Sequence, residues 1–233
     1  MTSDFYNSKF DKIPTLTWYP WIGIYYELQT ETKFLFVGES HYAQDSKGNF
    51  NAKQFEKMMA CKQETINVLN HAIKNNGEWK FFKNTHKAIV GENSFDIKHF
   101  WSNVAFMNFI QKPMKTNLGR PTSKDYEDGW INFIEVLKII QPSHCIFLGS
   151  GAANHLSKII KQSNNLSYEI TLNHKKIGAY YGKKVSLTID NHTTNITFIK
   201  HPSSYFQWKL WFDYLTTRNG EAIKKLRERI LKA

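Results

Sequence analysis

The chain has 233 residues, 41% of them hydrophobic and 15% aromatic, which suits one α/β domain with a substantial core and excludes a repetitive or low-complexity protein. It carries 31 Lys and Arg against 20 Asp and Glu, and this net charge of +11 favours a polyanionic partner, because each neutralised phosphate releases counterions. Two unpaired-looking cysteines and the lack of a long apolar run argue against an iron–sulfur cluster, a disulfide framework and a transmembrane helix.

The first half of the chain is expected to alternate strand and helix. Residues 33–37 form a continuous apolar run that ends at a glycine, which is typical of a central parallel strand. Apolar residues then recur at helical spacing over residues 52–75. Residues 76–100 are mixed, and a second strand is expected over residues 102–106.

The second half repeats this alternation. A helix is predicted over residues 121–140, and Pro142 ends it. A third strand over residues 145–148 runs into a Gly-Ser-Gly turn and a further helix. Two β runs follow at residues 184–190 and 194–200.

The last part of the chain is predicted to be helical, with an aromatic helix at residues 208–214 and a basic amphipathic helix at residues 220–232. Strands that alternate with helices indicate an α/β fold with a central, mainly parallel sheet of four to five strands and helices on both faces. Functional sites in such sheets form at the carboxyl ends of the strands. Three polar clusters lie at predicted strand ends in this sequence.

The first cluster follows the strand at residues 33–37 and reads Gly-Glu-Ser-His-Tyr. Gly38 permits close approach of the backbone to a ligand, and Glu39 then lies at the rim of the sheet. Asp45, further along the same loop, is a second candidate carboxylate. A solvated turn with an incidental acid is the alternative.

The second cluster centres on Asn103, whose amide offers both a donor and an acceptor and can read one edge of a base. A core asparagine satisfied by the backbone is the alternative. The third cluster reads His-Pro-Ser-Ser-Tyr-Phe and follows the last β run, where His201 and Ser203 present polar groups at the strand end. A structural histidine is the alternative there.

Taken in order, these clusters resemble the motifs of the uracil-DNA glycosylase superfamily. The resemblance rests on Gly-Glu-Ser-His-Tyr, on Asn103, on Arg-Pro-Thr at residues 120–122, on a strand that ends in Leu-Gly, and on His-Pro-Ser. It implies a three-layer α/β/α fold of the uracil-DNA glycosylase type. It also implies an enzyme that hydrolyses the N-glycosidic bond of a flipped-out uracil or modified base in DNA and leaves an abasic site.

The resemblance further implies roles for individual residues. Glu39 matches the opening of the water-activating loop, and His201 matches the histidine that stabilises negative charge on the leaving base. Tyr42 matches the aromatic wall of the base pocket, and Phe50 matches the ring that stacks on the extruded base. Asn103 matches the amide that hydrogen-bonds the pyrimidine edge.

Two positions depart from the standard uracil enzymes. Ser40 stands where they carry an aspartate, and His41 stands where they carry a proline, so both are candidate base-pocket residues. The resemblance places the contacts to DNA after His201, where a serine grips a phosphate and an aromatic ring fills the vacated stack. The candidate DNA-binding residues are Ser203, Ser204, Tyr205 and Phe206.

Two other functions stay open at this point. Ser40, at the usual aspartate position, motivates a catalytically silent nucleic-acid-binding module on the same fold, and a hydrolase of free nucleosides is the third possibility. We expect a monomer of one domain (residues 1–233) that binds single- or double-stranded DNA and needs no metal or cofactor. Because no charged-then-apolar leader opens the sequence, we expect it to be cytoplasmic and to make no membrane contact.

Residues 51–99 form a long insertion between the first two motifs. Its aromatic and lysine side chains predict a DNA-contacting or pocket-forming element, and a helical pair that pads the fold is the alternative. The residues that motivate this expectation are Trp79, Lys80, Phe81, Phe82, Lys83 and Lys87.

Overall fold

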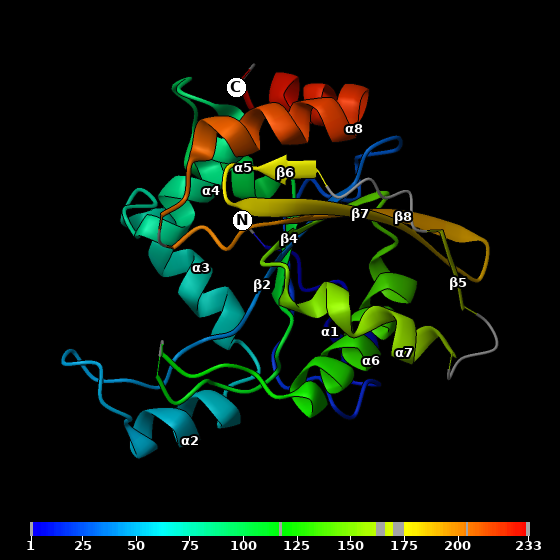
Figure 1. Ribbon diagram of the computed structural model, residues 1–233. Coiled ribbons are helices and arrows are strands. Elements are labelled where there is room, and N and C mark those ends of the chain that lie inside the picture. The colour runs from blue at the N-terminus through cyan, green and yellow to red at the C-terminus, as the bar shows by residue number, and fades with distance from the viewer. Residues whose placement is uncertain (1, 117, 162–165, 170–174, 204, 232–233) are drawn as a thin grey trace.

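The computed structural model describes residues 2–116, 118–161, 166–169, 175–203 and 205–231. The protein is a mixed α/β structure whose strands form one mixed sheet of eight strands, in the order β1-β3-β2-β4-β8-β7-β5, with β6 paired to β7 (Figure 1). The α/β class expected from the alternation of strands and helices is therefore confirmed.

The centre of the sheet is parallel. Its four neighbouring strands are β3 (Ala105–Asn108), β2 (Phe34–Gly38), β4 (His144–Leu148) and β8 (His192–Ile199). Every residue of β2 and β3 is buried, as expected for apolar runs covered on both faces. Because the four strands run the same way, their carboxyl ends meet at one edge, which we call the carboxyl edge. The opposite edge is the amino edge.

Antiparallel strands extend this centre on both sides. The two-residue strand β1 (Trp21–Ile22) pairs with β3, and β7 (Tyr180–Ile189) pairs with β8. The strands β5 (Leu166–Glu169) and β6 (Lys175–Ile177) both pair with β7. The expected count of four to five strands is therefore wrong. Of the added strands, β7 contains the β run expected at residues 184–190, whereas β1, β5 and β6 have only two to four residues and lack the apolar runs that reveal the central strands.

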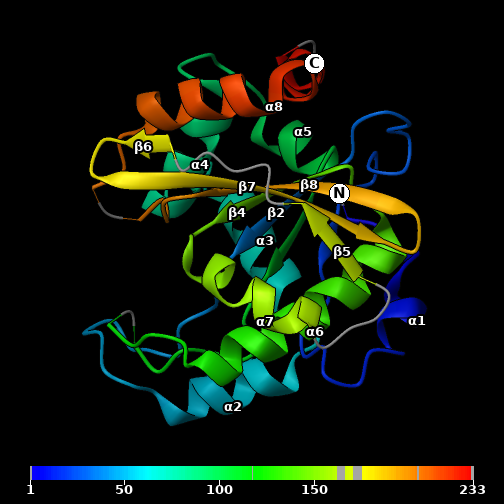
Figure 2. The same cartoon turned by 45° about the vertical axis from the view of Figure 1, so that its right-hand side comes forward.

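Helices lie on both faces of the sheet. Figures 1 and 2 show α8 (Trp208–Leu231) over one face, and α6 (Ser123–Ile140) with α7 (Leu156–Lys161) over the other. A four-residue 3-10 helix, η1 (Gly151–Asn154), precedes α7. Gly220 interrupts α8 with a φ of 46°, so this element consists of the two helical halves that the sequence predicts.

The insertion contains four helices rather than one long helix and a mixed region. They are α2 (Ala52–Ala60), α3 (Glu64–Lys74), α4 (Lys80–Val90) and α5 (Ile97–Ser102). The predicted helix over residues 52–75 is broken because the chain leaves helical geometry at Cys61, which ends α2 in an extended conformation. A short helix, α1 (Asn7–Phe10), contacts α6 near the start of the chain.

The second central strand begins later than the sequence predicts. Residues 102 and 103 end helix α5, whose first turn is capped by Asp96: its carboxylate accepts hydrogen bonds from the backbone N–H groups of Lys98 and His99. The apolar pair Phe100 and Trp101 is buried on this helix. This shift of the strand along the chain decides which asparagine lies at the carboxyl edge.

Candidate active site at the carboxyl edge

Glu39 follows β2 directly and lies at the carboxyl edge. The preceding residue has to be a glycine, because a Cβ on Gly38 would stand 2.4 Å from Oδ1 of Asn108. The backbone of Glu39 is held by the N–H of Ile110, which donates to its carbonyl oxygen at 2.9 Å. Burial raises the pKa of the Glu39 carboxyl, and the charge of Arg120 and the hydroxyl of Tyr126 offset this only in part.

A small cavity of about 20 Å³, room for about one water molecule, lies between the ends of β2 and β4 and opens to solvent. Glu39 and Tyr126 are its polar wall, and the Tyr126 hydroxyl stands 3.4 Å from Oε1 of Glu39. Burial, together with the nearby Glu39, raises the pKa of Tyr126 to about 12. The other lining residues are Val37, Gly38, Phe109, Phe147, Leu148, Gly149, Gly151 and Ala152.

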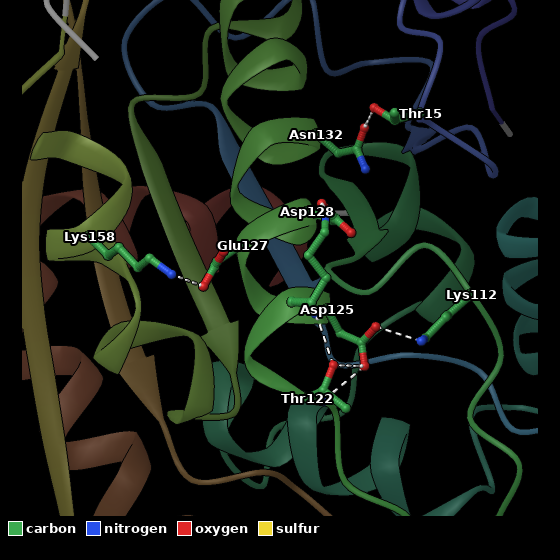
Figure 3. A network of polar contacts seen from close by, with 9 residues as sticks. Thr15, Lys112, Thr122, Asp125, Glu127, Asp128, Asn132 and Lys158 are labelled. Carbon is green, nitrogen blue, oxygen red and sulfur yellow. Dashed lines mark hydrogen bonds and ion pairs between the residues drawn. The ribbon is translucent and has the colours of Figure 1, made fainter. Parts of the chain in front are cut away.

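A polar network fixes the start of α6 and so positions Tyr126 (Figure 3). The side chains of Thr122 and Asp125 form a capping box, and Nζ of Lys112 lies 2.5 Å from Oδ1 of Asp125. Although burial opposes it, hydrogen bonds from Lys112 and Thr122 lower the pKa of Asp125. Ser40 donates its hydroxyl to the carbonyl of Lys112 at 2.5 Å, which joins the loop after β2 to this network.

His201 follows β8 at the same edge. Its Nδ1 accepts a hydrogen bond from the backbone N–H of Ser203 at 3.3 Å, and the Ser203 hydroxyl lies 2.9 Å from the same nitrogen. Burial lowers the pKa of His201 to about 4, and the charges of Arg120 and Lys200 lower it further. The imidazole is therefore neutral at pH 7, and its one proton is on Nε2. Within the described residues, Nε2 has no hydrogen-bond partner, so it offers a free donor.

Arg120 connects the two halves of the site electrostatically. Its charge acts on Glu39 and Tyr126, where it lowers the pKa against the effect of burial, and on His201, where it adds to that effect. It also acts on Tyr42, whose pKa is raised by burial and by Glu39. These four residues therefore all lie within electrostatic range of Arg120. The sequence singled out Glu39, Tyr42 and His201, but it gave no role to Tyr126.

Asn103 does not reach this site, and the expectation that it joins Glu39 and His201 is wrong. It ends α5 at the amino edge, ahead of β3. Its Nδ2 donates to the carbonyl of His99 at 2.9 Å, and its Oδ1 accepts from Nε2 of Gln29 at 3.1 Å. This is the alternative considered from the sequence, a buried asparagine satisfied within the fold.

Asn108 occupies the carboxyl edge instead. It ends β3, lies opposite Gly38 in the parallel register, and is 4% exposed. Its Nδ2 lies 3.0 Å from Nε2 of His41, which is also 3.2 Å from Oγ1 of Thr65. The sequence does contain a signal for this placement of Asn108: the apolar run Ala-Phe-Met precedes it, as an apolar run precedes Gly38. His41 therefore forms a hydrogen bond with Asn108 and does not line the cavity.

Two predicted residues of the first loop lie outside this group. Asp45 is exposed, and its carboxylate accepts hydrogen bonds from the backbone N–H groups of Lys47 and Asn49, both at 2.9 Å. These bonds organise a turn and lower the pKa of Asp45. Phe50 is 43% exposed and packs on Phe55, with rings 6.0 Å apart. Neither residue lines the cavity.

The predicted DNA contacts after His201 separate into two kinds. Phe206 is 9% exposed and stacks on Trp211 at 6.1 Å, so it belongs to the core. Tyr205 is 89% exposed and is the aromatic side chain that faces solvent. Ser203 contacts His201, and Ser204 lies outside the described residues.

The insertion contacts this loop directly. The ring of Phe81, on α4, lies 5.3 Å from the ring of His201. Nδ2 of Asn84, one turn further along α4, donates to the carbonyl of Pro202 at 2.5 Å. The insertion therefore packs against the loop that holds His201, but none of its residues lines the cavity beside Glu39, and its role in contacting DNA or forming a pocket stays a prediction.

The remaining observations concern the whole chain. Among the described residues, no helix is long and apolar enough to cross a membrane, and no group of three or more His, Cys, Asp or Glu side chains is arranged to hold a metal ion. Both cysteines are free, and Cys145 is buried in β4, as its apolar surroundings indicate. Comparison with protein-family models and with curated proteins finds no match for this chain.

Proposed function

We propose that the protein is a DNA glycosylase that hydrolyses the N-glycosidic bond of a flipped-out uracil or modified base and leaves an abasic site. The observation that carries this proposal is that two groups with complementary chemistry follow parallel strands at the carboxyl edge. One is Glu39, a carboxyl whose pKa burial raises, and the other is His201, a neutral imidazole with a free Nε2–H donor.

Breaking an N-glycosidic bond develops positive charge on the sugar and negative charge on the leaving base. The carboxylate of Glu39 stabilises the first and accepts a proton from the water that attacks the sugar carbon. As the carbon–nitrogen bond breaks, its electron pair moves onto the base, and Nε2–H of His201 donates a hydrogen bond to the base oxygen. A raised pKa makes Glu39 a better proton acceptor for this step.

Asn108 is the residue we assign to the base edge in place of Asn103. It ends the strand beside Glu39, and its amide offers an acceptor and a donor, as reading a base requires. Tyr42, which the charges of Glu39 and Arg120 both affect, remains the candidate aromatic wall. The base has to leave its stack first, which costs a few kcal/mol, so an unpaired or damaged base is the easiest substrate.

The topology supports the finer fold assignment that we propose, a three-layer α/β/α arrangement of the uracil-DNA glycosylase type. The parallel strands lie in the order β3-β2-β4-β8, so the first of them in the chain is central and the site forms where neighbouring strands connect in opposite directions. Glu39 and His201 follow the first and the last of these four strands.

Ser40 favours a second candidate, a catalytically silent nucleic-acid-binding module. Its hydroxyl is bound to the carbonyl of Lys112, so the position that resembles a catalytic aspartate serves the structure of the loop here. In that case the site would hold a base without releasing it. The two candidates differ in whether Glu39 performs chemistry.

The experiment is a base-release assay by mass spectrometry on DNA that carries many natural modifications, with free nucleosides alongside. We expect release from DNA, and Glu39→Gln should lower its rate roughly 10²–10⁴-fold, because the substitution keeps the shape and removes the general base. Glu135→Gln, on an exposed face of α6, is the matched control and should release bases as the wild type does. DNA binding without release from any substrate would establish the silent module.

A further inference from the structure

Two groups of side chains flank the loop that holds His201, and neither has a role in the chemistry above. One is the tyrosine–lysine cluster, formed by Tyr180, Lys200 and Tyr205. The other is the lysine row, formed by Lys80, Lys83 and Lys87 on α4. We call the two together the flanking surface.

Lys200 holds the tyrosine–lysine cluster together. Its Nζ donates to the carbonyl of Tyr205 at 2.8 Å and lies 3.8 Å from the ring centre of Tyr180 and 5.8 Å from that of Tyr205. Tyr205 has a φ of 49°, a left-handed conformation that is unfavourable for a tyrosine. The bond from Lys200 supports this conformation, which leaves the Tyr205 ring 89% exposed, while Tyr180 is 42% exposed.

The hairpin that carries Tyr180 packs firmly on α8. At its turn, Gly178 adopts a φ of 59°, and a Cβ there would stand 2.8 Å from Oε1 of Gln207. A Cβ on Gly182 would stand 2.3 Å from the ring of Tyr214. The hairpin therefore fits closely at these two glycines, and Tyr180 is placed in advance of any ligand, which lowers the entropic cost of binding.

The lysine row lies on α4, the helix that packs against the same loop. Lys80, Lys83 and Lys87 are three and four residues apart, so they project from one face of α4. That helix contacts the loop through Phe81, which packs on His201, and through Asn84, which bonds to Pro202. In the part of the chain that the structure describes, none of the three lysines forms an ion pair with an acidic side chain, and neither does Lys200.

We propose that the flanking surface binds single-stranded nucleic acid on both sides of the nucleotide that enters the site. This inference rests on the proposed function and names its substrate class. Exposed tyrosine rings stack well only on bases with a free face, and bases inside a duplex are already stacked on both sides. Lysines without acidic partners suit the phosphates of the same strand. The tyrosines therefore select an unpaired strand, and the lysine row adds affinity without selecting.

The test measures binding to an unmodified oligonucleotide of about 15 nucleotides, single-stranded or as a matched duplex, by fluorescence anisotropy at several salt concentrations. The wild type should bind the single strand at least several-fold more tightly. Tyr180→Ala and Tyr205→Ala should each weaken single-strand binding roughly tenfold, leave duplex binding and the salt dependence unchanged, and so remove the preference. Tyr25→Ala is the matched control for Tyr180→Ala, because Tyr25 is 40% exposed and lies near the amino edge. It should bind as the wild type does.

The lysine row is tested in the same assay. Replacing Lys80 and Lys83 together by Ala should weaken binding to both forms and reduce the slope of log affinity against log salt by roughly one to two. Equal wild-type affinity for duplex and single strand, or tyrosine variants that bind single strands normally, would overturn the inference. Because the oligonucleotide contains no substrate base, its outcome is independent of base release: single-strand selection without release would remove only the proposed chemistry, and release without selection would remove only this inference.

Discussion

The two edges of the parallel sheet carry similar polar residues, but they use them differently. At the amino edge, the hydroxyl of Ser143 accepts a hydrogen bond from the N–H of Lys33 at 3.0 Å, and Thr194 donates to the carbonyl of Pro142 at 2.8 Å. The amide of Asn103 is likewise bound within the fold. These bonds join strand ends to the segments beside them, as buried polar groups generally require.

At the carboxyl edge, the side chains of Glu39 and His201 keep unused hydrogen-bonding capacity. His201 is bound through Nδ1, which leaves Nε2 without a partner among the described residues, and Glu39 has a single long contact of 3.4 Å with Tyr126. Both side chains have a shifted pKa because burial has removed water without supplying full compensation. The comparison teaches that unused hydrogen-bonding capacity, rather than residue type, separates candidate functional residues from structural ones.

The largest expected effect that separates the edges is on His201. His201→Ala should lower the rate of base release roughly 10²–10³-fold, because it removes a preorganised donor worth about 3 kcal/mol in the transition state. His192→Ala, at the amino edge, should leave release unchanged, since Nε2 of His192 is engaged with the carbonyl of Pro142. Single-turnover rates on a modified oligonucleotide measure both. Normal release by His201→Ala would contradict the assignment of the donor.

The two asparagines give a more direct comparison, because both are buried to 4% exposure. Asn108→Ala should slow base release about tenfold or more, by the 1–3 kcal/mol that a bidentate base contact contributes. Asn103→Ala should leave release unchanged and lower the free energy of unfolding by about 1–3 kcal/mol, since it breaks bonds to His99 and Gln29.

Release rates and urea unfolding of both variants show which asparagine affects base release and which affects stability. Release has to be measured well below the unfolding temperatures of the variants. If Asn103→Ala slows release and Asn108→Ala does not, the assignment based on position at the carboxyl edge fails.

Much of the central fold could be predicted from local signals. The strands β2, β4 and β8 are apolar runs, and α6 starts at a capping box and ends before Pro142. The strand β1 has two residues, too few to show alternation. The strand predicted over residues 102–106 starts too early because Ser102 and Asn103 end the six-residue helix α5, which is too short to show a helical period.

The site residues also divide into those that local sequence signals reveal and those that they do not. Glu39 and His201 come directly after predicted strands, so sequence order alone places them at the carboxyl edge. The predicted strand began at residue 102 whereas β3 begins at Ala105, and this three-residue error assigned to Asn103 the role that we now propose for Asn108. The contribution of Tyr126 and Arg120 depends on how α6 packs against the loop after β2, through Lys112 and Asp125, and no local pattern reports such a contact.

The smallest expected effect concerns His144, at the amino end of β4, which shares its low pKa with His201. Burial, with a contribution from Lys184, lowers the pKa of His144 to about 4. Because the folded pKa lies below the usual value near 6.5, the neutral form is favoured in the fold, and this stability is present above that value and is lost as the pH falls towards 4.

His144→Gln cannot take up that proton, so its unfolding free energy should fall less than that of the wild type over this interval, by about 1 kcal/mol after allowance for partial exposure. Urea unfolding at pH 7 and at pH 4.5 measures the difference, and base release at pH 7 should be unchanged. Equal acid sensitivity of the two proteins would mean that His144 does not titrate with folding. A loss of release at pH 7 would mean that the amino edge also shapes the site. Since both histidines have a low pKa and only His201 follows a strand at the carboxyl edge, this variant separates the effect of burial from the effect of position at that edge.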